Sequence, residues 1–142
     1  MTPAHAILGS IEIKAKLSIV WDMLTNPDKI LIYTGSSAKT DWKVGSEIIW
    51  EWRQNNHIHL YEGEIIENMK YKKIRYKYRP TSGKVPENAN LYIFVTCILD
   101  QVSKDKTLFT YVRENIPSED EKKHMEEYIP SMLAKMKKIA EA

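Results

Sequence analysis

Large aromatic side chains with polar tips recur at alternating positions in this sequence. Trp50 and Trp52 flank Glu51, and Tyr76 and Tyr78 flank Lys77. Because successive residues of a strand point to opposite faces of a sheet, each pair shares one face. Rings gathered on one face could enclose an apolar molecule, or they could fill the core themselves.

The candidate ligand-binding residues are the rings of this face, two methionines of a C-terminal amphipathic segment and two polar anchors. They are Trp50, Trp52, His59, Tyr61, Tyr76, Tyr78, Phe109, Tyr111, Arg113, Met132 and Met136. Methionine adapts its shape easily to a bound molecule. Eight tyrosines against two phenylalanines favour a cavity, because each buried hydroxyl needs a partner. The interpretation that the rings simply fill the core stays open.

Residues that could bind a metal or carry out catalysis are sparse. His57 and His59 share one face of a strand, but Glu62 and Glu64 fall on the opposite face, so a third metal ligand is missing. Ser118 is explained by helix capping, and no glycine-rich nucleophile turn or phosphate loop occurs. We predict no catalytic residue, no metal and no cofactor.

A basic stripe alternates with the tyrosines of the same strand. Its members are Lys73, Arg75, Lys77 and Arg79. The stripe could contact an acidic protein partner or a second copy of the chain. Nucleic acid is not expected as a partner, because Tyr76 and Tyr78 point away from the basic residues and offer no stacking platform beside them. A solvated outer face is the favoured interpretation.

The length of 142 residues predicts one domain over residues 1–142. No apolar run is long enough to span a membrane, and Met1 to Ser10 lack the features of a secretory signal. The single Cys97 fits a reducing compartment, where it would be a small core residue. We predict a soluble, cytoplasmic protein.

The elements that must position the aromatic face begin with a half-buried strand over Ile11–Lys16. Ser18 is expected to cap a short helix over Ile19–Leu24. Asn26 and Pro27 then form the cap and first residue of a second short helix, which ends near Tyr33. The segment from Thr34 to Gly45 is predicted to be a loop.

The central strands follow from a hairpin. Asn55-Asn56 can form its two-residue turn, since asparagine tolerates positive φ. This turn would pair Trp52 with His59, Trp50 with Tyr61, and Ile48 with Gly63, all on one face. The next strand spans Ile74–Tyr78.

The C-terminal half is expected to hold two strands and a long helix. Leu91–Asp100 is apolar on both faces, and we favour the set Ile93, Val95 and Cys97 as the inward one. Thr107–Arg113 is the last strand. Ser118 and Glu121 form a capping box, and Pro130 should kink the helix that follows. The apolar positions of this helix are Met125, Ile129, Met132, Met136 and Ile139.

This order predicts an α+β fold in which a curved antiparallel sheet of about six strands wraps around the C-terminal helix, with two short helices after the first strand. Several motifs resemble the activator of Hsp90 ATPase (AHSA1-like) group of the SRPBCC, or START-like, helix-grip superfamily. They are the segment Ile11–Pro27 with its Val20-Trp21 pair, the segment Asp41–Ile48, the triplet Gly63-Glu64-Ile65, and Thr107.

The chain departs from that group at two positions: Ile129 stands where a tryptophan is frequent, and Arg113 stands where a histidine is common. The eukaryotic Hsp90 activators carry a further N-terminal domain that these residues do not supply, so the resemblance does not imply full co-chaperone activity.

Three functions are compatible with these observations. We favour non-enzymatic binding of a small hydrophobic or aromatic molecule between the sheet and the C-terminal helix, with Arg113 or His59 as polar anchor. The second is a polyketide-cyclase or hydrolase-like enzyme, in which His59, Tyr61 or Arg113 would act as acid, base or oxyanion stabiliser. The third is a chaperone-linked or stress-related protein-interaction module that uses the basic stripe.

Overall fold

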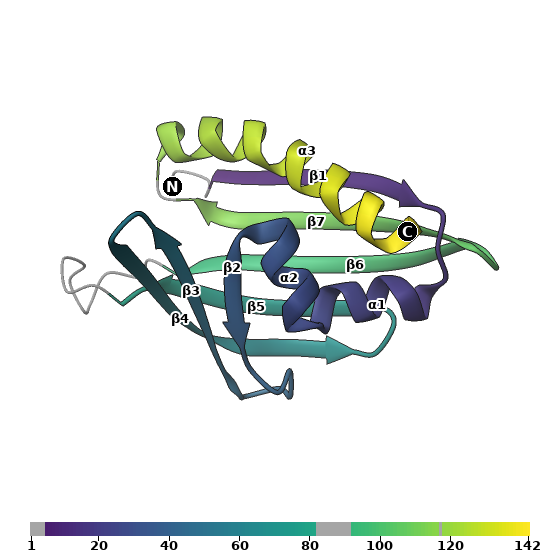
Figure 1. Cartoon of the computed structure of the whole chain (residues 1–142), viewed down its shortest axis with the longest axis horizontal. Coiled ribbons are helices and arrows are strands. Elements are labelled where there is room, and N and C mark those ends of the chain that lie inside the picture. Colours follow the sequence, from purple (N-terminus) through teal and green to yellow (C-terminus); the bar gives the residue numbers. More distant parts are fainter. Residues whose placement is uncertain (1–4, 82–91, 117) are drawn as a thin grey trace.

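The computed structural model describes residues 5–81, 92–116 and 118–142. In this part of the chain, seven strands form one antiparallel sheet in the order β1-β7-β6-β5-β4-β3-β2, and three helices accompany it (Figure 1). The elements are β1 (His5–Ile13), α1 (Leu17–Thr25), α2 (Pro27–Thr34), β2 (Ser36–Lys39), β3 (Glu47–Gln54), β4 (His57–Met69), β5 (Lys73–Pro80), β6 (Ile93–Ser103), β7 (Lys106–Ile116) and α3 (Glu119–Glu141). The α+β helix-grip prediction is confirmed, with seven strands in place of about six.

The additional strand is β2, in the segment that the sequence predicted to be a loop. Ser36 pairs with Trp52 and Lys39 with Ile49, which places β2 at the sheet edge beside β3. Only Ala38 of this short strand is buried, so its sequence carries no apolar alternation. Its pairing depends on the free edge of β3, which the local sequence does not reveal.

The start of the chain differs from the prediction in several boundaries, the first being that β1 begins at His5 rather than at Ile11. Strand β1 ends at Ile13 rather than Lys16, because the carbonyl of Ala15 instead accepts a hydrogen bond from the buried Thr107 hydroxyl at 2.8 Å. The cap of α1 is Lys16, so the prediction of Ser18 as cap was wrong: Ser18 lies inside the helix. The Lys16 carbonyl already accepts the first helical hydrogen bonds, which leaves Ser18 no capping role.

The other local signals are confirmed. The Asn26 side chain accepts a hydrogen bond from the Asp28 amide at 3.0 Å, and Pro27 is the first residue of α2. Strands β3 and β4 pair in the predicted register, with Trp52 opposite His59 and Trp50 opposite Tyr61. Asn55 in the turn has φ of 55°, the left-handed conformation that asparagine tolerates.

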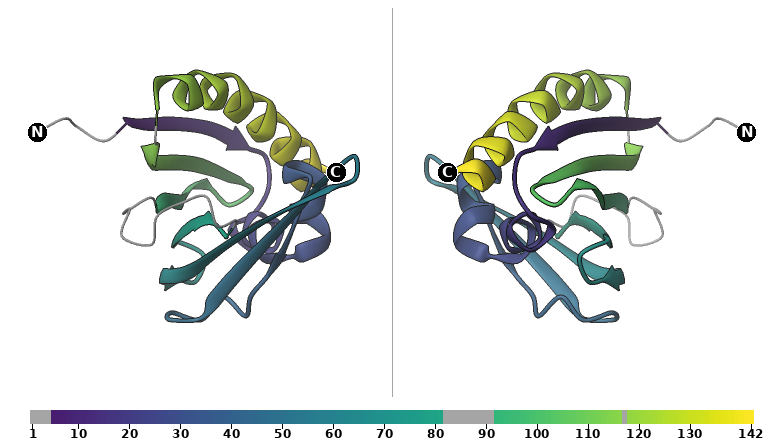
Figure 2. Two further views of the ribbon diagram at one scale, coloured as in Figure 1. Left: turned by 90° about the vertical axis from the view of Figure 1, so that its left-hand side faces the viewer. Right: turned by 90° about the vertical axis from the view of Figure 1, so that its right-hand side faces the viewer.

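Helix α3 covers the sheet on the same side as α1 and α2, and the sheet curves around them (Figure 2). The Ser118 hydroxyl accepts a hydrogen bond from the Glu121 amide at 3.1 Å, which confirms the predicted cap. The buried residues of the helix are Ile129, Met132, Leu133, Met136 and Ala140. Pro130 lies inside the helix, and the helix bends along its length in Figure 2.

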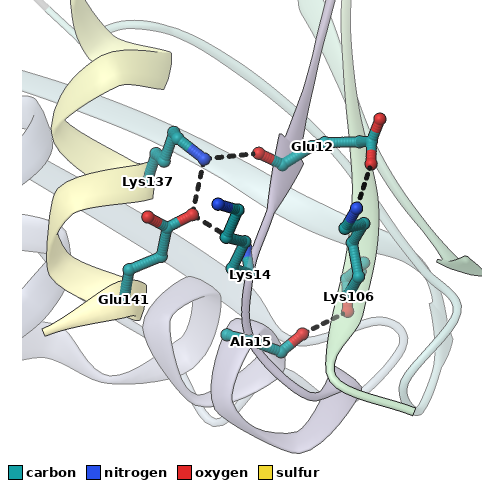
Figure 3. A network of polar contacts seen from close by, with 7 residues as sticks. Glu12, Lys14, Ala15, Lys106, Lys137 and Glu141 are labelled. Carbon is teal, nitrogen blue, oxygen red and sulfur yellow. Dashed lines mark hydrogen bonds and ion pairs between the residues drawn. The ribbon is translucent and has the colours of Figure 1, made fainter. Parts of the chain in front are cut away.

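Polar contacts hold the end of α3 against the end of β1 (Figure 3). Lys137 donates to the Glu12 carbonyl at 2.9 Å and pairs with Glu141 at 2.5 Å. The Glu141 carboxylate also accepts a hydrogen bond from the Lys14 amide at 2.8 Å. Both bonds lower the pKa of Glu141, the one from Lys137 contributing more. The last turn of α3 is therefore fixed to the chain segment that follows β1.

The inward face of β6 is the one predicted. Val95 pairs with Tyr76 and Cys97 with Ile74, and both β6 residues are buried. The predicted first residue of this strand, Leu91, lies outside the described residues, and β6 begins at Ile93. Thr96 on the opposite face is also buried, which explains why the sequence is apolar on both faces.

Gly63 is the position where the sheet tolerates no side chain. A Cβ atom there would lie 1.7 Å from the Lys77 carbonyl oxygen, so β4 and β5 would have to separate. We expect Gly63→Ala to destabilise the protein by more than about 4 kcal/mol, or to prevent folding, measured by urea denaturation. Gly9→Ala is the matched control, because its Cβ would meet only side chains of α3, at 3.1 Å, and should cost about 1–3 kcal/mol. Equal losses at both positions would contradict this account of the β4–β5 contact.

The Cys97 thiol should be unreactive in the folded protein. Burial raises its pKa to about 12, so the thiol stays protonated and shielded at pH values where free cysteine ionises. At about pH 8.5 we expect iodoacetamide to alkylate Cys97 roughly a thousandfold more slowly in native protein than in urea. A Ser103→Cys variant, whose thiol would lie at the exposed end of β6, is the control and should react at once. Rapid native alkylation of Cys97 would show that this face of the core opens.

Candidate functional site

An aromatic cluster lines the concave side of β3, β4 and β5. The rings of Trp50 and Tyr76 lie 5.8 Å apart, those of Tyr76 and Tyr78 6.1 Å apart, and those of Tyr61 and Tyr78 5.8 Å apart. The prediction that these rings share one face is therefore confirmed. Tyr76 is buried, whereas Trp50, Tyr61 and Tyr78 are half-buried.

Arg113 on β7 joins this cluster from across the sheet. Residues Arg113, Val95 and Tyr76 form one row over β7, β6 and β5. The guanidinium donates through Nη1 to the Tyr111 hydroxyl at 3.0 Å and through Nη2 to the Tyr78 hydroxyl. Its carbon Cζ lies 5.4 Å from the centre of the Tyr78 ring. Tyr78 lies two residues beyond Tyr76 on β5, opposite Ile93, so Arg113 reaches it diagonally across β6.

Among the described residues, two buried donors on this face have no hydrogen-bond acceptor. They are Nε of Arg113 and Nε1 of Trp50. Arg113 as a whole is half-buried, but its Nε atom is shielded from solvent. A buried donor without a partner costs about 1–3 kcal/mol, so such groups are rare and call for an explanation.

The charge of Arg113 is not neutralised by its neighbours. Burial raises the pKa of Tyr111 and Tyr78 above its ordinary value, although Arg113 lowers both in part, so both hydroxyls stay neutral at neutral pH. Burial disfavours the charged guanidinium, but the Tyr111 and Tyr78 hydroxyls more than offset this and keep the pKa of Arg113 above its usual range. No ion pair found among the described residues includes Arg113. Among the described residues, Arg113 is therefore a cation at the centre of the cluster without an ion-pair partner.

The remaining predicted site residues divide into two groups. Phe109, Met132 and Met136 are buried in the core, where they support the cluster from below. His59 is exposed near the tip of the β3–β4 hairpin and stacks on Trp52 with ring centres 5.0 Å apart. The structure thus brings Arg113, not His59, into contact with the tyrosines.

Two tyrosines near the cluster were missed in the sequence. Burial raises the pKa of Tyr128 on α3, Tyr111 raises it further, and Arg113 lowers it in part, so Tyr128 lies close to both. Tyr33 on α2 is buried beside Cys97 and Tyr111, with a pKa raised by burial first and by these neighbours second. The spacing of Tyr128 from Met132 along the helix could have revealed the first of them.

The basic stripe lies on the outer face, as predicted, but acids on the neighbouring strands balance much of it. Its ion pairs are Lys73 with Glu67 at 3.1 Å, Arg75 with Glu114 at 3.9 Å, and Arg79 with Glu62 at 3.5 Å. Lys77 lies over the Tyr92 ring at 4.5 Å. Exposed pairs of this kind contribute little stability each, but they lower the net charge that the outer face presents.

A hollow on the surface lies away from the predicted site residues. It has a volume of about 400 Å³, lies between β1 and α3 and contains none of those residues.

Over residues 5–81, 92–116 and 118–142, no group of His, Cys, Asp or Glu side chains is arranged to hold a metal ion. None of the helices in the described part of the chain has the length and apolar character needed to cross a bilayer. The cytoplasmic location stays a prediction.

Comparisons with solved structures place this fold among known proteins. A protein from Cytophaga hutchinsonii, solved in solution, has a TM-score of 0.81 and 27% identity, covering 97% of this chain and 94% of that chain. The Aha1 dimer from Colwellia psychrerythraea has a TM-score of 0.76 and 20% identity, covering 96% of both chains. An Hsp90 activator from Plasmodium falciparum has a TM-score of 0.59 and 22% identity, covering 79% of this chain and 74% of that chain.

Sequence comparisons give the family. A search of curated proteins found no significant match. The family model described as activator of Hsp90 ATPase homolog 1-like protein, however, matches residues 14–141. Because this match spans nearly the whole chain, the protein belongs to the activator of Hsp90 ATPase homolog 1-like family.

Proposed function

We propose that this protein binds a small hydrophobic or aromatic molecule against the aromatic cluster, without catalysing a reaction. The observation that carries the proposal is the pair of buried donors without acceptors, Arg113 Nε and Trp50 Nε1, among rings that are only partly covered. A structural core made for stability alone would avoid unpaired donors. A bound molecule would cover the rings and supply acceptors.

The arrangement of burial across the cluster supports binding. Tyr76 and Tyr111 are buried at the base, whereas Trp50, Tyr61 and Tyr78 keep part of their surface exposed. Partly exposed rings with polar tips are typical of walls that contact ligands, because they offer apolar area and hydrogen bonds together.

Catalysis is less well supported by the same groups. An acid–base mechanism needs a group that can exchange a proton near neutral pH. Burial raises the pKa of Tyr78 and Tyr111, and Arg113 stays charged, so these side chains form hydrogen bonds without exchanging protons under those conditions. The cluster therefore suits recognition better than proton transfer.

The binding proposal can be tested with the neutral fluorescent probe N-phenyl-1-naphthylamine. We expect its emission to rise on binding and the melting temperature of the protein to increase with probe concentration. Tyr61→Ala should weaken binding at least about fivefold, because its half-buried ring belongs to the aromatic cluster. Ile58→Ala, at an exposed position of the same hairpin, is the matched control and should have no effect. Absence of both emission change and thermal shift would refute the proposal.

A chaperone-linked interaction module is a second candidate, favoured by the family description and by the likeness to the Plasmodium falciparum Hsp90 activator. It predicts that the chain binds purified Hsp90 in a salt-sensitive way and changes its rate of ATP hydrolysis. Lys77→Gln on the outer face should weaken this binding, whereas Lys135→Gln on the exposed side of α3 should not. No change in ATP hydrolysis at any concentration of the chain would remove this candidate.

A further inference from the structure

Arg113 keeps one of its buried donors unpaired. Among the described residues its Nε has no acceptor, which is unfavourable for the free protein, because the hydrogen bond that Nε would make with water is not replaced. Proteins retain such unfavourable groups chiefly at functional sites. Glu114, its neighbour in sequence, does not compensate it, because Glu114 pairs with Arg75 on the outer face of the sheet.

The geometry of the guanidinium group is also suited to binding an anion. Arginine presents five N–H donors in a planar fork, and the edge formed by Nε and one terminal nitrogen binds a carboxylate with two parallel hydrogen bonds. In Arg113 the terminal nitrogens contact Tyr111 and Tyr78, and Nε has no acceptor. The two tyrosines hold the fork in place, and Nε stays buried and unpaired among the described residues.

The surroundings define the rest of the ligand. Trp50 carries the second unpaired buried donor on the same face, and the rings of Tyr61, Tyr76 and Tyr78 form an apolar wall between the two. A molecule that satisfies these groups needs an apolar body to cover the rings and oxygen acceptors at one end. A purely apolar ligand would cover the rings but leave Arg113 unpaired, which increases its desolvation.

We propose, resting on the binding function above, that the ligand is an amphipathic acid: an apolar, ring-containing body with one anionic oxygen head group, such as a carboxylate, held by Arg113. The inference assigns the ligand class and its orientation. The head group lies at β7, and the body extends over β5 and β4 toward Trp50 on β3.

The test compares two probes with the same aromatic body, the anionic 8-anilinonaphthalene-1-sulfonate and the neutral N-phenyl-1-naphthylamine. We expect the anionic probe to bind the native protein roughly 10- to 100-fold more tightly, which corresponds to one charge-assisted hydrogen-bonded contact. 2-Naphthoate should displace it at least about tenfold better than 2-naphthylmethanol. In a ¹H–¹⁵N spectrum, the Nε–H signal of Arg113 should shift with the anionic probe and not with the neutral one.

The variants separate an anchoring role from a structural one. Arg113→Met should abolish the preference for the anion, so that the anionic probe binds no more tightly than the neutral one. Arg113→Lys should retain part of the preference. Arg53→Met, at an exposed arginine of the same sheet, is the matched control and should leave the preference intact.

Each of the following outcomes would refute a different part of the proposal. Equal affinity of the two probes for native protein refutes the anion anchor and leaves the binding function standing. A fall in melting temperature and in the affinity for both probes in Arg113→Met shows that the arginine is structural, which also refutes the anchor. Failure of both probes to bind refutes the binding function itself.

Discussion

The close approach of α3 to β1 is the constraint on which the remaining architecture depends. A Cβ at Gly9 would lie 3.1 Å from Ile129 and Leu133, so the missing side chain lets the helix lie directly on the strand. A one-sided sheet must cover its apolar face, and here α3 does so from the β1 edge, with α1 and α2 on the same side. The far part of the concave face, over β3 to β5, is consequently left to aromatic side chains.

Because of this division of the concave face, the residues that stabilise the fold and the residues proposed to bind a ligand lie in different places. The fully covered residues, such as Phe109, Ile48 and Met136, form a core that is close-packed and apolar. The polar groups without partners, Arg113 Nε and Trp50 Nε1, occur among the rings instead. The protein thus tolerates its unfavourable buried charge where the covering is incomplete and where a bound molecule could relieve it.

On the outer face of the sheet, by contrast, cations and anions pair with one another. The cations of its basic stripe come from one strand, β5, and the anions that pair with them come from β4, such as Glu62, and from β7 beyond β6, such as Glu114. Pairs between strands set the charge balance of this surface, so a basic stripe in the sequence becomes a mixed surface in the fold. Arg113, by contrast, points inward, where no acid on a neighbouring strand pairs with it.

The sequence alone determined the features that depend on near neighbours. The register of the β3–β4 hairpin, the shared face of Trp50 and Tyr76, and the caps at Asn26 and Ser118 follow from alternation, turn chemistry and capping, which act over a few residues. Tertiary structure decided the pairing of β2, whose sequence has no strand pattern, and the contact of Arg113 with Tyr78, 35 residues away. That contact exists because β6 brings β5 and β7 together in one sheet, where Val95 lies between Arg113 and Tyr76, and Tyr78 lies two residues further along β5. The order of strands is set by contacts distant in sequence, so no local pattern could reveal which polar anchor would meet the aromatic cluster.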